Sequence, residues 1–317
     1  MSNTIENIKK VTILGAGMMG PGMAQTFAYK GYDVTLWSRR AEVLPGVIEA
    51  VRNNMTVMAE KGIYKKEDIE PTVARVKTTD NFEEAVSDAD FVDEAIGENL
   101  ELKQDFFKRM DEMCKRDTIL ATNTSVISIT EIAAKSTHRD RIVGTHFWNP
   151  PHLIPLVEVI KAADTSDATM DKTFDLLEYV GKKPVRVKKD VPGFLANRLQ
   201  HALWREAISI VENGIADPAE VDIAVKNSFG LRLPVLGPME NADLAGTDLT
   251  LAIHNYVLKH IEDSHAPSPI LEEKVKEGNL GVKTGKGFQE WSDERAAALK
   301  GGLVEYLLEY HKNHPNG

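Results

Sequence analysis

Residues Val11-Thr12-Ile13-Leu14-Gly15-Ala16-Gly17-Met18-Met19-Gly20 join an apolar run to three glycines in the spacing G-x-G-x-x-G. In a strand–turn–helix unit, the first glycine permits a tight turn, the second lets the backbone approach a pyrophosphate, and the third lets helix and strand pack closely. The N-terminus of the following helix offers free N–H groups to phosphate. A second β-rich run at 34–37 completes a βαβ unit, so the stretch predicts a dinucleotide-binding turn rather than a purely structural one.

Short β-rich runs alternate with helix-like stretches over the first 190 residues. The runs are 11–14, 34–37, 91–94, 118–121, 142–145 and 155–160, and the helix-like stretches include 19–30, 44–61 and 100–114. This alternation predicts a parallel α/β sheet. From about Val191 onward, apolar residues recur at helical spacing and strand patterns disappear. We therefore expect an α/β N-terminal domain over residues 1–189 and an all-α C-terminal domain over residues 190–317.

Composition narrows the classes of partner. The 317 residues include 38 Lys and Arg against 48 Asp and Glu, a formal charge of −10, which disfavours nucleic acid as the main partner. The single cysteine, Cys114, excludes an internal disulfide and a multi-cysteine metal site, and is typical of a cytoplasmic protein. The charge-free stretch 11–29 is broken by glycines and Pro21, so we expect no export or membrane segment. No spacing of histidines suggests a metal site.

The second strand ends without the acidic residue that usually accepts hydrogen bonds from the adenosine ribose of NAD. Its end reads Trp37-Ser38-Arg39-Arg40, and the first carboxylate is Glu42. Ser38 leaves room for a 2′-phosphate, which Arg39 and Arg40 would hold by charge-assisted hydrogen bonds. This chemistry favours NADP over NAD. The alternative is that both arginines face solvent at a strand end.

Four polar residues, Ser125, His146, Glu158 and Asn197, follow or interrupt predicted strands or open the helical part. Three of them have a structural explanation: Ser125 as a helix cap, His146 as a core histidine, and Glu158 as a carboxylate on an edge strand. Asn149, in the segment that follows His146, is a good turn former before Pro150. Together the four polar residues suit removal of hydride from a secondary alcohol, which needs a base for the hydroxyl proton. A histidine serves as this base when a carboxylate orients it, and short hydrogen-bonding groups then fix the reacting oxygen.

Motifs spread over nearly the whole chain resemble the L-3-hydroxyacyl-CoA dehydrogenase family. They are the glycine turn with Gly22, the segment 94–103, Asn123-Thr124-Ser125, His146-Phe147-Trp148-Asn149-Pro150, Glu158, Pro192-Gly193-Phe194 with Asn197-Arg198, Gly237-Pro238, Asp243, Gly246, Asp248, and 283–288. The resemblance implies a Rossmann-type N-terminal domain and a helical C-terminal domain that binds substrate and forms a homodimer. It also implies a catalytic His146–Glu158 pair, with Ser125 and Asn197 near the substrate oxygen and the histidine.

The cofactor site expected from the glycine turn, the strand end and the resemblance has a definite set of residues. They are Gly15, Gly17, Met18, Met19, Gly20, Ser38, Arg39, Arg40, Glu98, Lys103, Asn123, Ser125 and Asn149. Glu98 and Lys103 match positions beside the nicotinamide half of the family's cofactor.

The sequence leaves two alternatives for the class of substrate. A 3-hydroxyacyl-CoA is favoured, and Lys61, with Lys65 and Lys66, is a candidate for its phosphates, although these lysines also suit a solvated helix face. Residues 149–152, 202–207 and 237–239 look more like relatives that act on small hydroxy acids or alcohols without CoA, of the carnitine or hydroxymethylpyridine type. There Arg205 is a candidate for a substrate carboxylate, or it forms only a surface ion pair.

We thus expect an NAD(P)-dependent dehydrogenase that interconverts a 3-hydroxy group and a ketone. A catalytically inactive dinucleotide-binding protein is a less favoured alternative, because such a scaffold needs no combination of Ser125, His146, Glu158 and Asn197. A serine hydrolase is weaker still, since the sequence has no G-x-S-x-G elbow.

Overall fold

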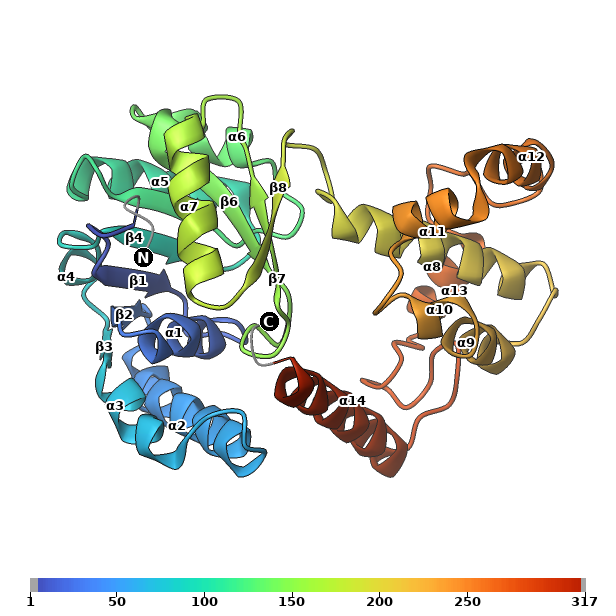
Figure 1. Ribbon diagram of the computed structural model, residues 1–317, viewed down its shortest axis with the longest axis horizontal. Helices are drawn as coiled ribbons and strands as arrows, with labels where there is room; N and C mark the ends of the chain where they lie inside the picture. The colour runs from blue at the N-terminus through green and yellow to red at the C-terminus, as the bar shows by residue number, and fades with distance from the viewer. Residues whose placement is uncertain (1–4, 315–317) are drawn as a thin grey trace. The chain divides into compact units, whose positions relative to one another are not determined.

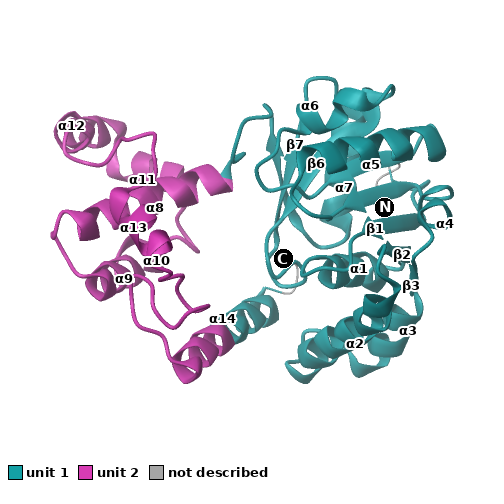
Figure 2. Cartoon of the chain, turned by 180° about the vertical axis from the view of Figure 1, so that it is seen from behind, with its two compact units in different colours: residues 1–195, 303–317 teal, residues 196–302 magenta. Residues whose placement is uncertain are grey.

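The computed structural model describes residues 5–314, which form two compact units (Figures 1 and 2). The first unit comprises residues up to Leu195 together with the chain from Leu303 onward, and the second comprises residues 196–302. Each unit is described by itself.

The first unit contains an eight-stranded sheet and its covering helices. In chain order its elements are β1 (Lys10–Leu14), α1 (Gly20–Tyr29), β2 (Asp33–Trp37), α2 (Leu44–Glu60), α3 (Ile69–Ala74), β3 (Val76–Thr79), α4 (Phe82–Val86), β4 (Phe91–Glu94), α5 (Leu100–Met113), β5 (Ile119–Thr122), α6 (Ile129–Ile132), β6 (Ile142–Phe147), β7 (Leu156–Ile160), α7 (Asp167–Tyr179) and β8 (Lys183–Val187). The α/β class is therefore confirmed.

The sheet has the order β3-β2-β1-β4-β5-β6-β7-β8. Strands β1 to β6 pair in parallel, as expected, but β7 pairs antiparallel with β6, and β8 then pairs in parallel with β7. The prediction of a wholly parallel sheet is wrong for these two strands. Only a short loop joins β6 to β7, whereas a parallel pair needs a crossover of a dozen or more residues.

Two hydrophobic clusters cover the two faces of the sheet. One contains side chains of α1, α2 and α7, such as Phe27, Met55 and Leu177, and the other contains side chains of α4, α5 and α6, such as Phe107 and Ile132. Successive strand residues alternate between the clusters, as expected for a sheet buried on both faces. This arrangement leaves the ends of the strands to carry polar side chains.

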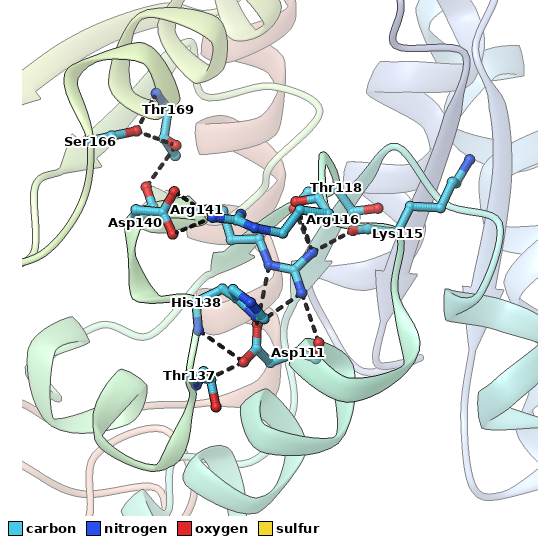
Figure 3. Close-up of polar contacts among 10 residues, drawn as sticks. All are labelled: Asp111, Lys115, Arg116, Thr118, Thr137, His138, Asp140, Arg141, Ser166 and Thr169. Atoms are coloured by element: carbon cyan, nitrogen blue, oxygen red, sulfur yellow. Dashed lines mark hydrogen bonds and ion pairs between the residues drawn. The ribbon is translucent and has the colours of Figure 1, made fainter.

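A buried ion pair ties α5 to the loop that precedes β6 (Figure 3). Arg141 donates to Asp111 Oδ1 from Nε at 3.2 Å and from Nη2 at 2.8 Å, and both side chains are 4% exposed. Arg141 also donates to the carbonyl oxygens of Lys115 and Thr118. Asp111 Oδ2 accepts from the backbone N–H groups of Thr137 and His138, so its carboxylate has partners on both sides. Every strong polar group of this pair is satisfied, as burial of charge requires.

The second unit is helical. Its elements are α8 (Ala196–Glu212), α9 (Pro218–Lys226), α10 (Phe229–Arg232), α11 (Pro238–Ala245), α12 (Thr247–Val257), α13 (Pro269–Lys276) and the start of α14 (Asp293–Asn313). Large apolar side chains are exposed on it, for example Met239 and Leu244. Within residues 5–314, no helix combines the length and the apolar character needed to cross a membrane.

The observed division differs from the expected boundary after residue 189. The chain leaves the first unit after Leu195, and α14 returns to that unit from Leu303 onward. The expectation that residues 190–317 form a single helical domain is therefore wrong for the C-terminal part. Leu307 and Leu308 are buried there in a cluster with Met58 and Leu153 of the first unit, which explains the return.

Candidate functional site

The glycine turn between β1 and α1 has the geometry that each of its three glycines requires. Gly15 has a φ of 129°, and a Cβ there would lie 2.5 Å from the carbonyl oxygen of Ala95. A Cβ on Gly20 would lie 1.9 Å from the carbonyl oxygen of Gly15. A Cβ on Gly17 would meet nothing within 4 Å, so the backbone there is open to a ligand. Met18, beside it, is exposed and Met19 is half-buried. This turn fits a dinucleotide pyrophosphate.

The end of β2 carries no carboxylate beside the turn. Ser38 is buried and its Oγ accepts from the backbone N–H of Arg40 at 3.2 Å. Arg39 and Arg40 are exposed. The strand end therefore presents a hydroxyl and two guanidinium groups where an adenosine ribose binds in this type of fold.

His146 and Glu158 face each other across the β6–β7 pair. They are register partners in the antiparallel ladder, and His146 Nδ1 lies 2.7 Å from Glu158 Oε2. His146 is 5% exposed and Glu158 is fully buried. Glu158 Oε1 accepts from the Leu195 backbone N–H at 2.8 Å, and Oε2 accepts from Trp148 Nε1 at 3.3 Å. The carboxylate is thus held at both oxygens.

The ring of His146 also packs between aromatic neighbours. The centroids of Trp148 and Phe194 lie 5.5 Å and 5.7 Å from that of His146. Phe194 has a φ of 49° and follows Gly193, whose φ is 76°, so an unusual turn of backbone brings this ring to the histidine. The imidazole is therefore fixed by its carboxylate partner and by packing.

A second network lies at the ends of β4 and β5, with Glu94 and Lys103 buried and Glu98 partly exposed. Lys103, 1% exposed, donates to Glu94 Oε1 at 2.6 Å and lies 3.4 Å from Glu98 Oε2. Glu98 Oε1 accepts from Thr124 Oγ1 and from the backbone N–H of Ser125. Burial opposes ionisation of Glu98, but the hydrogen bond from Thr124 and the charge of Lys103 leave its pKa below the usual range. This ionised carboxylate fixes the turn that presents Ser125.

The other expected residues occupy separate places. Asn123 Oδ1 accepts from the backbone N–H of Phe147 at 2.7 Å, which joins the ends of β5 and β6. Asn149 is exposed on the loop after β6. Ser125 is exposed at the end of β5, and Asn197 lies in the first turn of α8, in the second unit.

The two substrate candidates also lie in different units. Lys61 follows α2 in the first unit and forms an ion pair with Glu305. Arg205 lies on α8, donates to the carbonyl oxygen of Ser264 at 3.1 Å, and lines a cavity of about 950 Å³ with Trp204 and Phe288.

Sequence reasoning missed Glu94, which holds Lys103. Its Oε1 accepts from Lys103 Nζ and from the Ile96 backbone N–H, and its Oε2 accepts from Thr122 Oγ1. The available signal was a pair of carboxylates, Asp93 and Glu94, at the end of the short strand run 91–94. A charge at the carboxyl end of a parallel strand points to the functional edge of such a sheet.

The loop between the two strands of the His146–Glu158 pair is held by a buried lysine. Lys182 donates to the carbonyl oxygens of Pro151 and Ile154, and burial lowers its pKa to about 7. His152 in the same loop packs against α1, where a Cβ on Gly22 would lie 3.0 Å from its Nδ1. Burial, with the nearby charges of Lys182 and His311, lowers the pKa of His152 to about 4.

We expect His152 to make the protein less stable in acid. Between about pH 6.5 and pH 4 the unfolded chain binds a proton at His152 that the folded chain does not. The free energy of unfolding therefore falls over this window as pH decreases, by about 3 kcal/mol in total from this group. Urea unfolding at pH 7 and pH 4.5 measures the effect. The fall should be about 2 kcal/mol smaller in His152→Gln than in the wild type, and equal falls would contradict the assignment.

Two descriptions of one protein family match nearly the whole chain. The family described as "3-hydroxyacyl-CoA dehydrogenase, NAD binding domain" matches residues 10–191, and "3-hydroxyacyl-CoA dehydrogenase, C-terminal domain" matches residues 193–291. The chain belongs to the 3-hydroxyacyl-CoA dehydrogenase family. The expected resemblance and the two-part α/β and helical fold are thereby confirmed.

Relatives in this family include enzymes with and without CoA in their names. The chain is 37% identical over 305 residues to 5-formyl-3-hydroxy-2-methylpyridine 4-carboxylate 5-dehydrogenase of Mesorhizobium japonicum, covering 95% of this chain and 96% of that one. It is 39% identical over 284 residues to 3-hydroxybutyryl-CoA dehydrogenase of Clostridioides difficile, covering 89% and 99%. A crystal structure of the pyridine carboxylate dehydrogenase, described as an NAD⁺-dependent dismutase, has a TM-score of 0.86 at 35% identity and covers 96% and 98%.

Membership in the 3-hydroxyacyl-CoA dehydrogenase family makes the chain an NAD-dependent oxidoreductase that acts on a CH–OH group. The first unit is an NAD-binding domain, and the comparisons give no support to the expected preference for NADP. The comparisons agree on this type of reaction, but the names of the relatives give different substrates.

Proposed function

We propose that this chain oxidises the hydroxyl group of its substrate to a carbonyl group with His146 as the base and Glu158 as the residue that orients it. The observation that carries this proposal is the buried contact of 2.7 Å between His146 Nδ1 and Glu158 Oε2. A carboxylate accepts only, so Nδ1 carries the hydrogen and Nε2 is left with its lone pair.

The His146–Glu158 pair also favours protonation of the histidine during the reaction. When Nε2 takes the hydroxyl proton, the imidazole becomes cationic beside a buried carboxylate, which stabilises that charge. Glu158 stays in place because the Leu195 N–H and Trp148 Nε1 hold its oxygens. In the reverse direction, Nε2 returns the proton to the carbonyl oxygen.

Ser125 and Asn197 are proposed to position the reacting oxygen. A hydroxyl and an amide are suited to donate hydrogen bonds to it. The backbone of Ser125 is fixed by Glu98, which Lys103 supports in turn. Glu98 and Lys103 are therefore proposed to act through Ser125 and to line the nicotinamide side of the cofactor site.

NAD would be held at the glycine turn, where the open backbone at Gly17 and the N-terminus of α1 would bind its pyrophosphate. The cofactor supplies the hydride acceptor when it is bound. Met18, Met19, Asn123 and Asn149 complete the proposed cofactor site.

The end of β2 is proposed to set the choice between NAD and NADP. We expect Ser38→Asp to lower kcat/KM with NADPH relative to NADH at least about tenfold, because a carboxylate binds the ribose 2′-OH and repels a 2′-phosphate. Arg40→Ala should lower efficiency with NADPH more than with NADH, since it removes a guanidinium and adds no charge. Steady-state rates with both cofactors measure these ratios. Unchanged ratios in both variants would remove the role assigned to Ser38, Arg39 and Arg40.

The proposed reaction is tested by following NADH oxidation at 340 nm with keto acids and their CoA thioesters. Acetoacetate and acetoacetyl-CoA are the first pair of probes, and 5-formyl-3-hydroxy-2-methylpyridine 4-carboxylate, named in a relative, is a further probe for the dismutase reaction. Turnover of any of them, with transfer of deuterium from labelled NADH to the product, supports the reaction. Binding of NADH without turnover across the panel would favour an inactive dinucleotide-binding protein.

Both a 3-hydroxyacyl-CoA and a small free hydroxy acid are compatible with this chemistry, and the candidates Lys61 and Arg205 correspond to these classes. A homodimer through the second unit, supported by its exposed apolar side chains, is a further proposal, as is a cytoplasmic location. Light scattering on the purified chain measures the oligomeric state.

A further inference from the structure

The last part of α14 belongs to the first unit although the family's C-terminal match ends at residue 291. The C. difficile CoA relative aligns with 89% of this chain while covering 99% of its own length, so about a tenth of this chain has no counterpart there. The pyridine carboxylate dehydrogenase aligns with 95%. Residues 303–313 therefore lie beyond the part of the chain that the C-terminal family description matches.

This segment is anchored by burial and by a hydrogen bond. Leu307 is 8% exposed and Leu308 is 2% exposed, and both pack with Met58 of α2 and Leu153. His311 Nε2 donates to the carbonyl oxygen of Leu153, which lies on the loop between the strands of His146 and Glu158. Burial of two leucine side chains stabilises such a contact by a few kcal/mol, so the segment is held on this surface.

The anchored segment brings a carboxylate to the lysine that was the candidate for CoA phosphates. Lys61 Nζ lies 2.5 Å and 2.6 Å from the two oxygens of Glu305. Lys65, the second of the three candidate lysines, has its Nζ 3.7 Å from Glu67 Oε1. Two of the three lysines considered for phosphate, Lys61 and Lys65, are therefore already paired with carboxylates of this chain.

Resting on the proposed function, we propose that α14 restricts the His146 site to small free hydroxy acids by closing the Lys61 end of α2 to CoA thioesters. CoA carries a 3′-phosphate and a pyrophosphate, which proteins bind with unpaired cationic side chains or helix N-termini. Here Glu305 repels those phosphates and holds Lys61, and the leucine contacts keep Glu305 in place.

The net charge of residues 60–70 also disfavours binding of CoA phosphates at this end of α2. Residues 60–70 carry three lysines, Lys61, Lys65 and Lys66, against four carboxylates, Glu60, Glu67, Asp68 and Glu70. Glu305 adds a fifth negative charge. Arg52 of α2 pairs with Glu70, so this end of α2 carries one more negative than positive charge and offers no net positive charge to a polyanion. A small carboxylate substrate has no group that needs to reach it.

The test is calorimetric titration of the full chain with CoA itself. We expect the wild type to bind CoA with a Kd weaker than about 1 mM. Glu305→Lys removes the repelling charge and frees Lys61, so its Kd should be at least about tenfold lower than that of the wild type. The matched control is Glu309→Lys, which makes the same change of charge one helical turn further along and keeps the Lys61–Glu305 pair. The control should bind CoA as weakly as the wild type.

Kinetics with NADH give a second readout. The ratio of kcat/KM for acetoacetyl-CoA to that for acetoacetate should rise at least about tenfold in Glu305→Lys and stay unchanged in Glu309→Lys. Micromolar binding of CoA by the wild type, or equal behaviour of the two variants, would overturn the proposal. If no probe of the NADH assay panel is reduced while CoA binds as predicted, the proposed reaction fails and the role of α14 is supported, because the titration needs no turnover.

Discussion

Replacement of His146 by glutamine should lower kcat by about 10²- to 10⁴-fold while NADH still binds. Glutamine has a volume similar to that of histidine and retains hydrogen-bonding groups near Glu158, but it cannot take up the hydroxyl proton at neutral pH. The loss should appear in kcat and in kcat/KM alike, because proton transfer is needed only as the reaction proceeds. Initial rates of NADH oxidation with an accepted keto acid measure it.

Two controls keep this result specific. Titration of the variant with NADH should give the affinity of the wild type, since the glycine turn between β1 and α1 is untouched. The midpoint of thermal unfolding reports whether the partner left behind, the buried Glu158, disturbs the fold. A stable variant that binds NADH and keeps kcat within about fivefold of the wild type would exclude His146 as the base.

Replacement of Arg141 by methionine should lower the free energy of unfolding by about 3–5 kcal/mol. The change leaves Asp111 buried with two backbone donors but without its guanidinium partner, and it removes the donor for the carbonyl oxygens of Lys115 and Thr118. Burial opposes ionisation of Asp111, and the hydrogen bond from Arg141 is the largest of the effects that hold its pKa below the usual range. Without Arg141, the carboxylate loses that support.

A matched control lies beside this pair in Figure 3. Arg116 forms an ion pair of 3.0 Å with Asp140, but its side chain is 54% exposed and that of Asp140 is 50% exposed. Arg116→Met should therefore change stability by less than about 1 kcal/mol. Urea unfolding followed by circular dichroism compares the two variants with the wild type. Equal losses would show that burial of the Arg141–Asp111 pair does not determine its contribution.

The sequence predicted the elements whose hydrophobic pattern is strong. Strands β1, β2, β4, β5, β6 and β7 lie within a residue or two of the expected runs. Strand β3, Val-Lys-Thr-Thr, was missed because it is short and polar at the sheet edge, and β8 because it contains Pro184 and two charged residues. The reversed direction of β7 was missed because alternation of side chains predicts a strand but gives no direction.

Contacts between distant parts of the chain limited how much of the site could be predicted from the sequence. His146 and Glu158 are twelve residues apart and have complementary chemistry, which made their pairing easy to expect. Lys61 and Glu305 are 244 residues apart, and neither stands in a motif. Their contact depends on the return of α14 to the first unit, which is decided by the burial of Leu307 and Leu308 and has no local signal in the sequence.

The most direct measurement of the central claim is a crystal structure of the wild-type chain with NAD and a keto acid that the NADH assay identifies as a substrate. The carbonyl oxygen should lie within about 2.6–3.2 Å of His146 Nε2, with Nδ1 still hydrogen-bonded to Glu158. A keto acid bound at the nicotinamide with its reacting oxygen held by another side chain, away from His146, would show that His146 is not the base.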